Sequence, residues 1–177
     1  MLRYNVAELL RSAPGTSERH DITDLRLRLD DGLELGRPIE GHLRLTNSGR
    51  GILVQGHVET ALTESCSRCL RPAEATVSID LHEEALPSID LESGLPLDRD
   101  DEPDLLRLDD HHELDLEPAI RDAVSLAEPI APLCRPDCPG LCEVCGLDLA
   151  TNTGHGHPDD DVDPRLAAMA SLRDQLS

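Results

Sequence analysis

Apolar and polar residues alternate with a period of two over much of the first half of the chain. Leu25, Leu27 and Leu29 alternate with charged residues, and further alternating runs follow at 39–45, 52–62 and 75–81. Turn-forming segments such as "DDG" and "TNSGRG" separate these runs. The pattern predicts antiparallel strands with one buried face. The expected fold class is α+β, built on a small antiparallel β-sheet or a partly open barrel.

Helical periodicity appears in three places. "NVAELLRS" at 5–12 predicts a short helix, and "SAPGTSERH" at 12–20 is interpreted as a linker. The segment at about 115–128 predicts a long helix with Asp115 as its N-cap and Pro118 in its first turn. "DPRLAAMASLRDQL" predicts a terminal helix that packs on its own domain in preference to a partner.

Between the strands and the long helix, residues 86–104 are acidic, carry three prolines and lack a period. They are interpreted as an exposed loop, with short strands expected at 105–108 or 113–116. The expected organisation is a β-rich domain at 1–130, followed by a cysteine-rich C-terminal segment and terminal helix at 131–177.

The composition narrows the kind of core and the kind of partner. The chain has no Phe, no Trp and a single Tyr, so its core must be aliphatic, and a structural metal would supplement it. Residues 1–71 contain ten Arg and ten acidic residues, so the net charge of −20 falls on residues 72–177. Such a chain repels phosphate backbones, which disfavours broad nucleic-acid binding and makes RNA contact local or indirect.

The chain shows no signal-like N-terminus and no apolar run long enough to span a membrane, so we expect a soluble, cytoplasmic protein. In a reducing compartment its six cysteines favour metal ligation or redox chemistry over disulfides.

Six cysteines and two histidines have the spacing of metal ligands. "GLCEVCG" is a zinc-knuckle sequence, in which Cys142 and Cys145 share one ion and Gly146 permits the turn. His155 and His157 would complete that site. Another four-thiolate site would take Cys66 and Cys69 from "CSRC" with Cys134 and Cys138. Two closed, four-coordinate sites of this kind are structural and not catalytic.

A rival partition places Cys134, Cys138, Cys142 and Cys145 on a single ion and leaves Cys66 and Cys69 as a dithiol. The two-site partition is favoured because it assigns all eight candidate ligands to an ion, whereas the single-ion partition leaves two cysteines and two histidines unused. An interpretation without any metal ranks last. His111 and His112 are interpreted as part of a solvated turn. The remaining histidines at 20, 42, 57 and 82 are interpreted as isolated, and no Ser/His/Asp grouping is expected.

The motifs "CSRC", "LDLEPAIRDAVSLAEPI", "DCPGLCEVCG" and "DPRLA" together resemble the bacterial YceD family of large ribosomal RNA subunit accumulation proteins. Members of that family often carry C-x-C where this chain has His155 and His157. The resemblance implies a role in large-subunit ribosomal RNA accumulation and ribosome assembly, and a link to a large-subunit ribosomal protein.

These observations predict a non-enzymatic, acidic factor whose fold is stabilised by structural zinc. It is expected to act through a basic ribosomal protein or an assembly intermediate of the large subunit. One alternative is direct RNA binding by the zinc knuckles, which their acidic residues disfavour. Another is a zinc hydrolase or thiol oxidoreductase, which would need an open metal position or a low-pKa cysteine.

Overall fold

The computed structural model of the chain describes residues 2–29, 32–97 and 105–157. Within these ranges the fold is mostly β, with a five-stranded sheet, a two-stranded sheet and two short helices. The elements are, in order, β1 (Arg3–Asn5), α1 (Ala7–Arg11), β2 (Ser17–Leu25), β3 (Glu34–Asn47), β4 (Ile52–Ser65), β5 (Pro72–Leu86), β6 (Leu106–Arg107), β7 (Glu113–Asp115) and α2 (Glu117–Leu126).

The main sheet is an antiparallel run of four long strands in chain order, β2-β3-β4-β5, with the short β6 added parallel to β5. The expected antiparallel strands are confirmed for the runs that became β3, β4 and β5. The strand expected from Leu25, Leu27 and Leu29 is wrong, because β2 ends at Leu25 and residues 26–29 form no strand. The expectation of a purely antiparallel sheet is wrong for β6. The sheet ends at β2 on one edge and β6 on the other, so it is open and does not close into a barrel.

The interpretation of residues 12–20 as a linker is wrong for its second half. Ser17 to His20 form the start of β2 and pair with Thr46 to Leu43 of β3. Local sequence offers no apolar alternation there, and cross-strand hydrogen bonds to β3 supply the missing stabilisation. The turn at Ser48–Gly51 joins β3 to β4 as expected, with the Ser48 N–H donating to the Gly51 carbonyl at 2.9 Å.

The helix expected at 115–128 is shorter than predicted. It spans Glu117–Leu126, and Leu116 occupies the N-cap position. Asp115 ends β7 instead, although its carboxylate still accepts the Glu117 N–H at 3.0 Å and so satisfies one free donor of the first turn. No long helix is present in the described ranges, and the terminal helix expected from Asp163 onward lies outside them.

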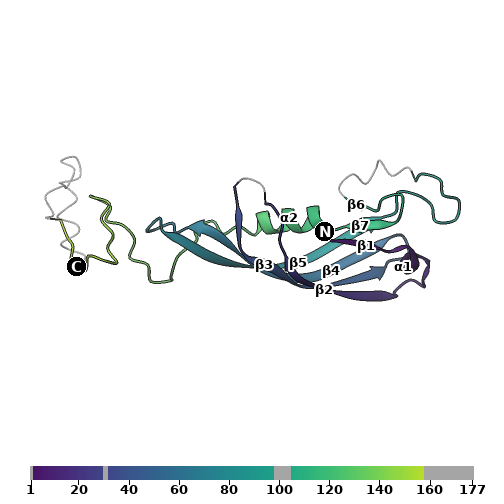
Figure 1. The fold of residues 1–177 in the computed structure, drawn as a ribbon, viewed down its shortest axis with the longest axis horizontal. Coiled ribbons are helices and arrows are strands. Elements are labelled where there is room, and N and C mark those ends of the chain that lie inside the picture. Colours follow the sequence, from purple (N-terminus) through teal and green to yellow (C-terminus); the bar gives the residue numbers. More distant parts are fainter. Residues whose placement is uncertain (1, 30–31, 98–104, 158–177) are drawn as a thin grey trace, which may run out of the picture.

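The core lies on one face of the sheet. Figure 1 shows α2 and the β1–β7 pair on that face, and α2 packs against β5. The most deeply buried side chains are aliphatic, as the composition requires; they include Ile39, Leu43, Leu45, Ile52, Val54, Leu62, Leu114, Leu116 and Ile120. The other face of β2–β5 is polar, because residues alternate along each strand between this core and solvent.

Leu86, the first residue of the acidic loop expected at 86–104, is the last residue of β5, and the described part of the loop that follows is an ordered turn. Ile89 bridges to Pro96, and the Asp90 carboxylate accepts the Ser93 N–H at 2.8 Å. No helix among the described residues has the length and apolar character to cross a membrane.

Candidate metal centres

The first cysteine pair lies in the tight turn between β4 and β5. The Cys66 carbonyl accepts the Leu70 N–H at 2.9 Å, and the Cys66 N–H donates to the Arg71 carbonyl at 2.8 Å. Leu70 takes a positive φ of 59° to close this turn. The turn directs Cys66 and Cys69 toward the segment that follows α2.

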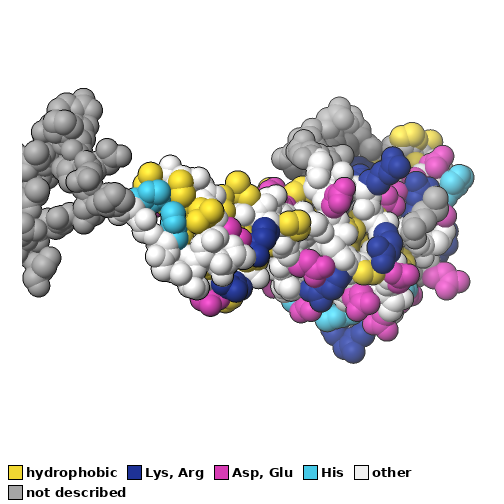
Figure 2. Space-filling view, turned by 60° about the vertical axis from the view of Figure 1, so that its left-hand side comes forward, with side chains coloured by type: hydrophobic (Ala, Val, Ile, Leu, Met, Phe, Trp, Pro, Cys, Tyr) yellow, Lys and Arg dark blue, Asp and Glu magenta, His cyan; other side chains and the backbone are white. Residues whose placement is uncertain are grey.

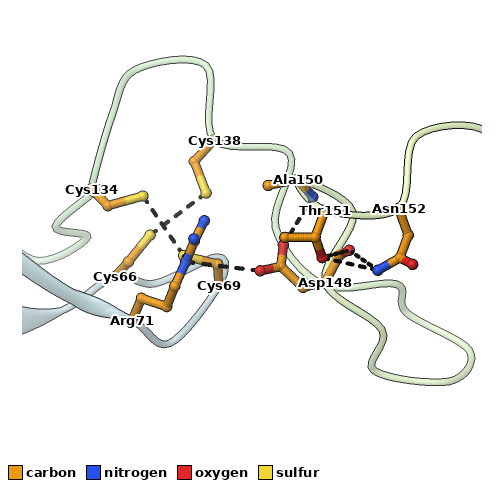
Figure 3. Close-up of polar contacts among 9 residues, drawn as sticks. All are labelled: Cys66, Cys69, Arg71, Cys134, Cys138, Asp148, Ala150, Thr151 and Asn152. Carbon is orange, nitrogen blue, oxygen red and sulfur yellow. Dashed lines mark hydrogen bonds and ion pairs between the residues drawn. The ribbon is translucent and has the colours of Figure 1, made fainter.

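Cys134 and Cys138 meet this pair from the other side (Figure 3). Sγ of Cys66 lies 3.8 Å from Sγ of Cys138, and Sγ of Cys69 lies 3.7 Å from Sγ of Cys134. All four sulfur atoms fall within 4.8 Å of one another. Four thiolates placed tetrahedrally at about 2.3 Å from a zinc ion would be about 3.8 Å apart, so this group has the size of a zinc site.

Backbone contacts hold the two halves of this four-cysteine group together. The Ser67 N–H donates to the Pro132 carbonyl at 2.8 Å, and the Leu141 N–H donates to the Arg68 carbonyl at 3.1 Å. The Arg68 guanidinium donates to the Cys138 carbonyl at 2.9 Å. Leu141 and Leu133 pack against the buried sulfur atoms, and this small cluster is separate from the main core.

The electrostatics of the four-cysteine group suit a bound cation. The backbone N–H groups of Cys134 and Cys69 lower the pKa of Cys66 to about 6. Burial, reinforced by the Cys138 and Cys69 thiols, raises the pKa of Cys134 to about 12. Because thiolates so close together repel one another, they cannot all ionise alone, and a divalent cation would remove that penalty.

The second group lies further along the same segment. The Cys142 carbonyl accepts the Gly146 N–H at 2.8 Å, and Gly146 takes a φ of +72°, which completes the knuckle turn. Sγ of Cys145 lies 3.2 Å from Nε2 of His155 and 3.3 Å from Nε2 of His157. The four ligand atoms again lie within 4.8 Å of one another.

The second group is more open than the first. Cys145 and His157 are exposed, and Cys142 and His155 are half-buried, whereas three of the first group's four cysteines are buried. The backbone N–H groups of Cys145 and Val144 lower the pKa of Cys142 to about 6, which favours the thiolate that a metal needs.

The eight predicted ligands are thus brought together in two groups of four, the partition favoured on the sequence. The rival grouping of Cys134, Cys138, Cys142 and Cys145 is not the one observed. Both groups are geometrically compatible with metal binding. Their donor sets, four thiolates in one and two thiolates with two imidazoles in the other, are those of structural zinc sites.

The structure also reveals a side-chain cluster that no sequence motif indicates. Nδ1 of His57 lies 2.7 Å from the Asp80 carboxylate, and Nε2 lies 3.3 Å from the Ser78 hydroxyl. These residues lie on β4 and β5, on the exposed face of the sheet. The interpretation of His57 as isolated is therefore wrong, and so is the expectation of no Ser/His/Asp grouping, since Ser78, His57 and Asp80 lie within hydrogen-bond distance. The cross-strand register that places His57 opposite Asp80 cannot be read from residues 23 positions apart.

His111 and His112 lie in the turn between β6 and β7, as expected. The Asp109 carboxylate accepts the N–H groups of His111 and Glu113 at 2.9 and 2.8 Å. Neither histidine belongs to a group of metal-ligand geometry within the described residues.

Comparison with known proteins places these features in a family. Residues 54–173 match the family model "Large ribosomal RNA subunit accumulation protein YceD", a span that contains all eight candidate ligands. The chain is 36% identical over 176 residues to uncharacterized proteins of Mycobacterium tuberculosis and Mycobacterium bovis, covering 97% of this chain and 81% of theirs. A protein of Mycobacterium leprae is 34% identical over 141 residues, 79% of this chain and 61% of its own. No solved structure matches.

The match covers well over half of the chain and includes both cysteine groups, the β4–β5 turn and α2. The chain therefore belongs to the YceD family, which is named for large ribosomal RNA subunit accumulation.

Proposed function

We propose that the chain is a non-enzymatic, cytoplasmic factor in the accumulation of large-subunit ribosomal RNA, and that two structural zinc ions fix its C-terminal segment to its sheet. Membership of the YceD family supports the ribosomal role. The observation that carries the structural role is the grouping of eight donors as two sets of four. A four-coordinate ion with four protein ligands has no open position for water or substrate.

Bound ions would stabilise the C-terminal segment, because apart from the hydrogen bonds around the four-cysteine group few contacts hold it. Between α2 and residue 157 the structure has turns and a single isolated bridge, Leu141 to Asp148. Its buried apolar contacts are confined to the small cluster around the first cysteine group. Binding of structural zinc is worth about 10–16 kcal/mol at neutral pH in small zinc peptides, so two ions would supply the missing stability.

Charge supports a basic protein as the partner. Residues 72–177 carry the whole net charge of −20. A large-subunit ribosomal protein of positive charge would complement this negative surface. Figure 2 shows hydrophobic and His side chains gathered at the narrow end that carries the candidate metal centres. Leu70, Val144 and Leu147 are exposed there by 67%, 69% and 38%, and such apolar side chains beside acidic ones suit a protein contact.

The proposal is tested by deleting the gene and measuring the ratio of large- to small-subunit ribosomal RNA. We expect the ratio to fall and the wild-type chain to restore it. Cys66→Ser and Cys142→Ser should fail to restore it, because each opens one metal group. Glu8→Gln, an exposed residue of α1 outside the metal groups and the acidic C-terminal part, is the control and should restore it fully. An unchanged ratio in the deletion strain would refute the ribosomal role.

A further inference from the structure

Two arginines oppose each other on the exposed face of the sheet. Arg19 of β2 and Arg44 of β3 are directly paired in the strand register, and both are exposed. Neither makes an ion pair with any residue in the described part of the chain. Like charges directly opposite each other destabilise an antiparallel pair. Their opposition is therefore explained best by an anionic group that binds both.

The arginine pair continues as a row across four strands. Arg44 is opposite Gln55 of β4, and Gln55 is opposite His82 of β5. The row spans roughly 14 Å, because neighbouring strands are about 4.8 Å apart. It offers two guanidinium groups, an amide and an imidazole, and it contains no carboxylate. In a chain with 36 acidic residues against 16 arginines, such a row is a distinct feature of the sheet.

The row borders a hollow of about 650 Å³ that is open to solvent. The next row along the strands completes its lining with Asp21, His42, His57 and Asp80. Asp80 hydrogen-bonds His57, and this bond, with help from Glu59, raises the pKa of the imidazole, so the charge of Asp80 is partly neutralised. Asp21 is opposite His42 in the register. The lining is polar except for Leu43 and Gly56.

We propose that this row, Arg19, Arg44, Gln55 and His82, binds the phosphodiester backbone of RNA. A guanidinium donates two parallel hydrogen bonds to a phosphate, and two opposed guanidiniums can hold neighbouring phosphates of one strand. A row of polar donors along an open hollow, with only Leu43 and Gly56 as apolar lining, suits contact with a phosphate backbone better than with apolar peptide side chains. The inference goes beyond the proposed protein partner, since it gives the factor a local RNA contact far from the zinc knuckles.

The test is the salt dependence of binding of a labelled single-stranded RNA oligonucleotide, followed by fluorescence anisotropy with the metal-loaded chain. The wild-type chain should bind at low salt with an affinity that falls as salt rises. Arg19→Gln with Arg44→Gln should weaken binding by about tenfold for each arginine. The slope of log affinity against log salt should become shallower by about 0.7 for each phosphate that the variant no longer neutralises.

Arg11→Gln with Arg28→Gln is the matched control, since both are exposed arginines outside the hollow. It removes the same charge and should leave the slope unchanged. Equal effects of the two double variants, or no wild-type binding at low salt, would overturn the assignment. So would equal binding of a polyglutamate peptide, which would make an acidic protein the occupant. Neither double variant touches a metal ligand, so metal content and the deletion phenotype report separately on the proposed function.

Discussion

The Arg71 guanidinium bridges Cys69 of the first cysteine group and Asp148, which lies just beyond the knuckle turn of the second. Nε of Arg71 lies 3.5 Å from Sγ of Cys69 and 3.9 Å from a carboxylate oxygen of Asp148 (Figure 3). The Asp148 carboxylate in turn accepts the Ala150 N–H at 2.9 Å. One side chain of the β4–β5 turn thus connects the two candidate metal centres.

Arg71→Gln should weaken zinc binding at the four-cysteine group about tenfold. The Arg71 side chain is the main cause of the lowered pKa of Cys69, so its removal disfavours the thiolate. Substitution of residues that support metal ligands in this way typically lowers metal affinity by about 10–100-fold. Competition with a chromogenic chelator measures the change. Arg135→Gln, which removes an exposed arginine paired with Asp137, is the control, and an equal effect of both changes would contradict the prediction.

Gly140→Ala should destabilise the contact between the C-terminal segment and the β4–β5 turn by about 1–2 kcal/mol. Gly140 takes a φ of +79°, and a Cβ there would lie 3.2 Å from both the Cβ and the carbonyl oxygen of Arg68. Gly146→Ala is the matched control, since its φ is +72° with no atom within 4 Å of the added Cβ. Hydrogen exchange of the Leu141 amide, which donates to Arg68, should rise more in Gly140→Ala.

Asn47→Ala should lower the free energy of unfolding by about 2 kcal/mol. The buried Asn47 amide donates to the carbonyls of Leu9, Leu10 and Ser12 at 2.9, 3.2 and 3.0 Å. It thereby satisfies carbonyl groups at the C-terminal end of α1 that lack helical partners. Asn47→Asp should cost more, because a carboxylate would face the same oxygens. Asn5→Ala removes an exposed amide and should cost less than about 1 kcal/mol. Urea unfolding measures all three, and a decrease no greater for Asn47→Ala than for Asn5→Ala would contradict the account.

His57 should titrate above its ordinary pKa of 6.5, and Asp80→Asn should bring that pKa back toward 6.5. The hydrogen bond to Asp80 is the largest cause of the increase, and Glu59 is the next. Glu59→Gln should therefore have a smaller effect. Proton-detected NMR titration of the imidazole measures each shift, and no difference between Asp80→Asn and the wild type would contradict the prediction.

The same pair sets the direction of a pH effect on stability. Because the pKa of His57 is raised in the folded chain, the protonated imidazole stabilises the fold below about pH 6.5. This contribution is lost as the pH rises through the raised pKa. The pKa of Asp80 is lowered below 3.8 by His57, so its contribution is lost as pH falls through that lowered value. The difference in stability between wild type and Asp80→Asn should therefore be largest between about pH 4 and 6.5.

Much of the sheet could be predicted because period-two alternation is a property of the sequence itself. Leu43 and Leu45, or Val54 and Val58, show which face of each strand is buried before any pairing is known. The β5–β6 pairing could not be predicted, since a parallel partner of two residues has no period of its own. The start of β2 was missed because Ser17–His20 gain their structure from β3.

The candidate metal centres were predictable because C-x2-C spacing and the number of ligands constrain which side chains can share an ion. The supporting residues were not. Arg71 and Asp148 are 77 positions apart and carry no spacing signal, and only the fold brings them to one another. The opposition of Arg19 and Arg44 likewise depends on the register of β2 against β3, which alternation alone leaves open.

The most direct test of the account is the metal content per chain, measured by native and denaturing mass spectrometry of the wild type, Cys66→Ser and Cys142→Ser. Two zinc ions bound to the wild type, falling to one in each variant, is the predicted result. A folded wild-type chain without bound metal would contradict the account. A single ion that persists in Cys66→Ser would contradict the partition into two centres.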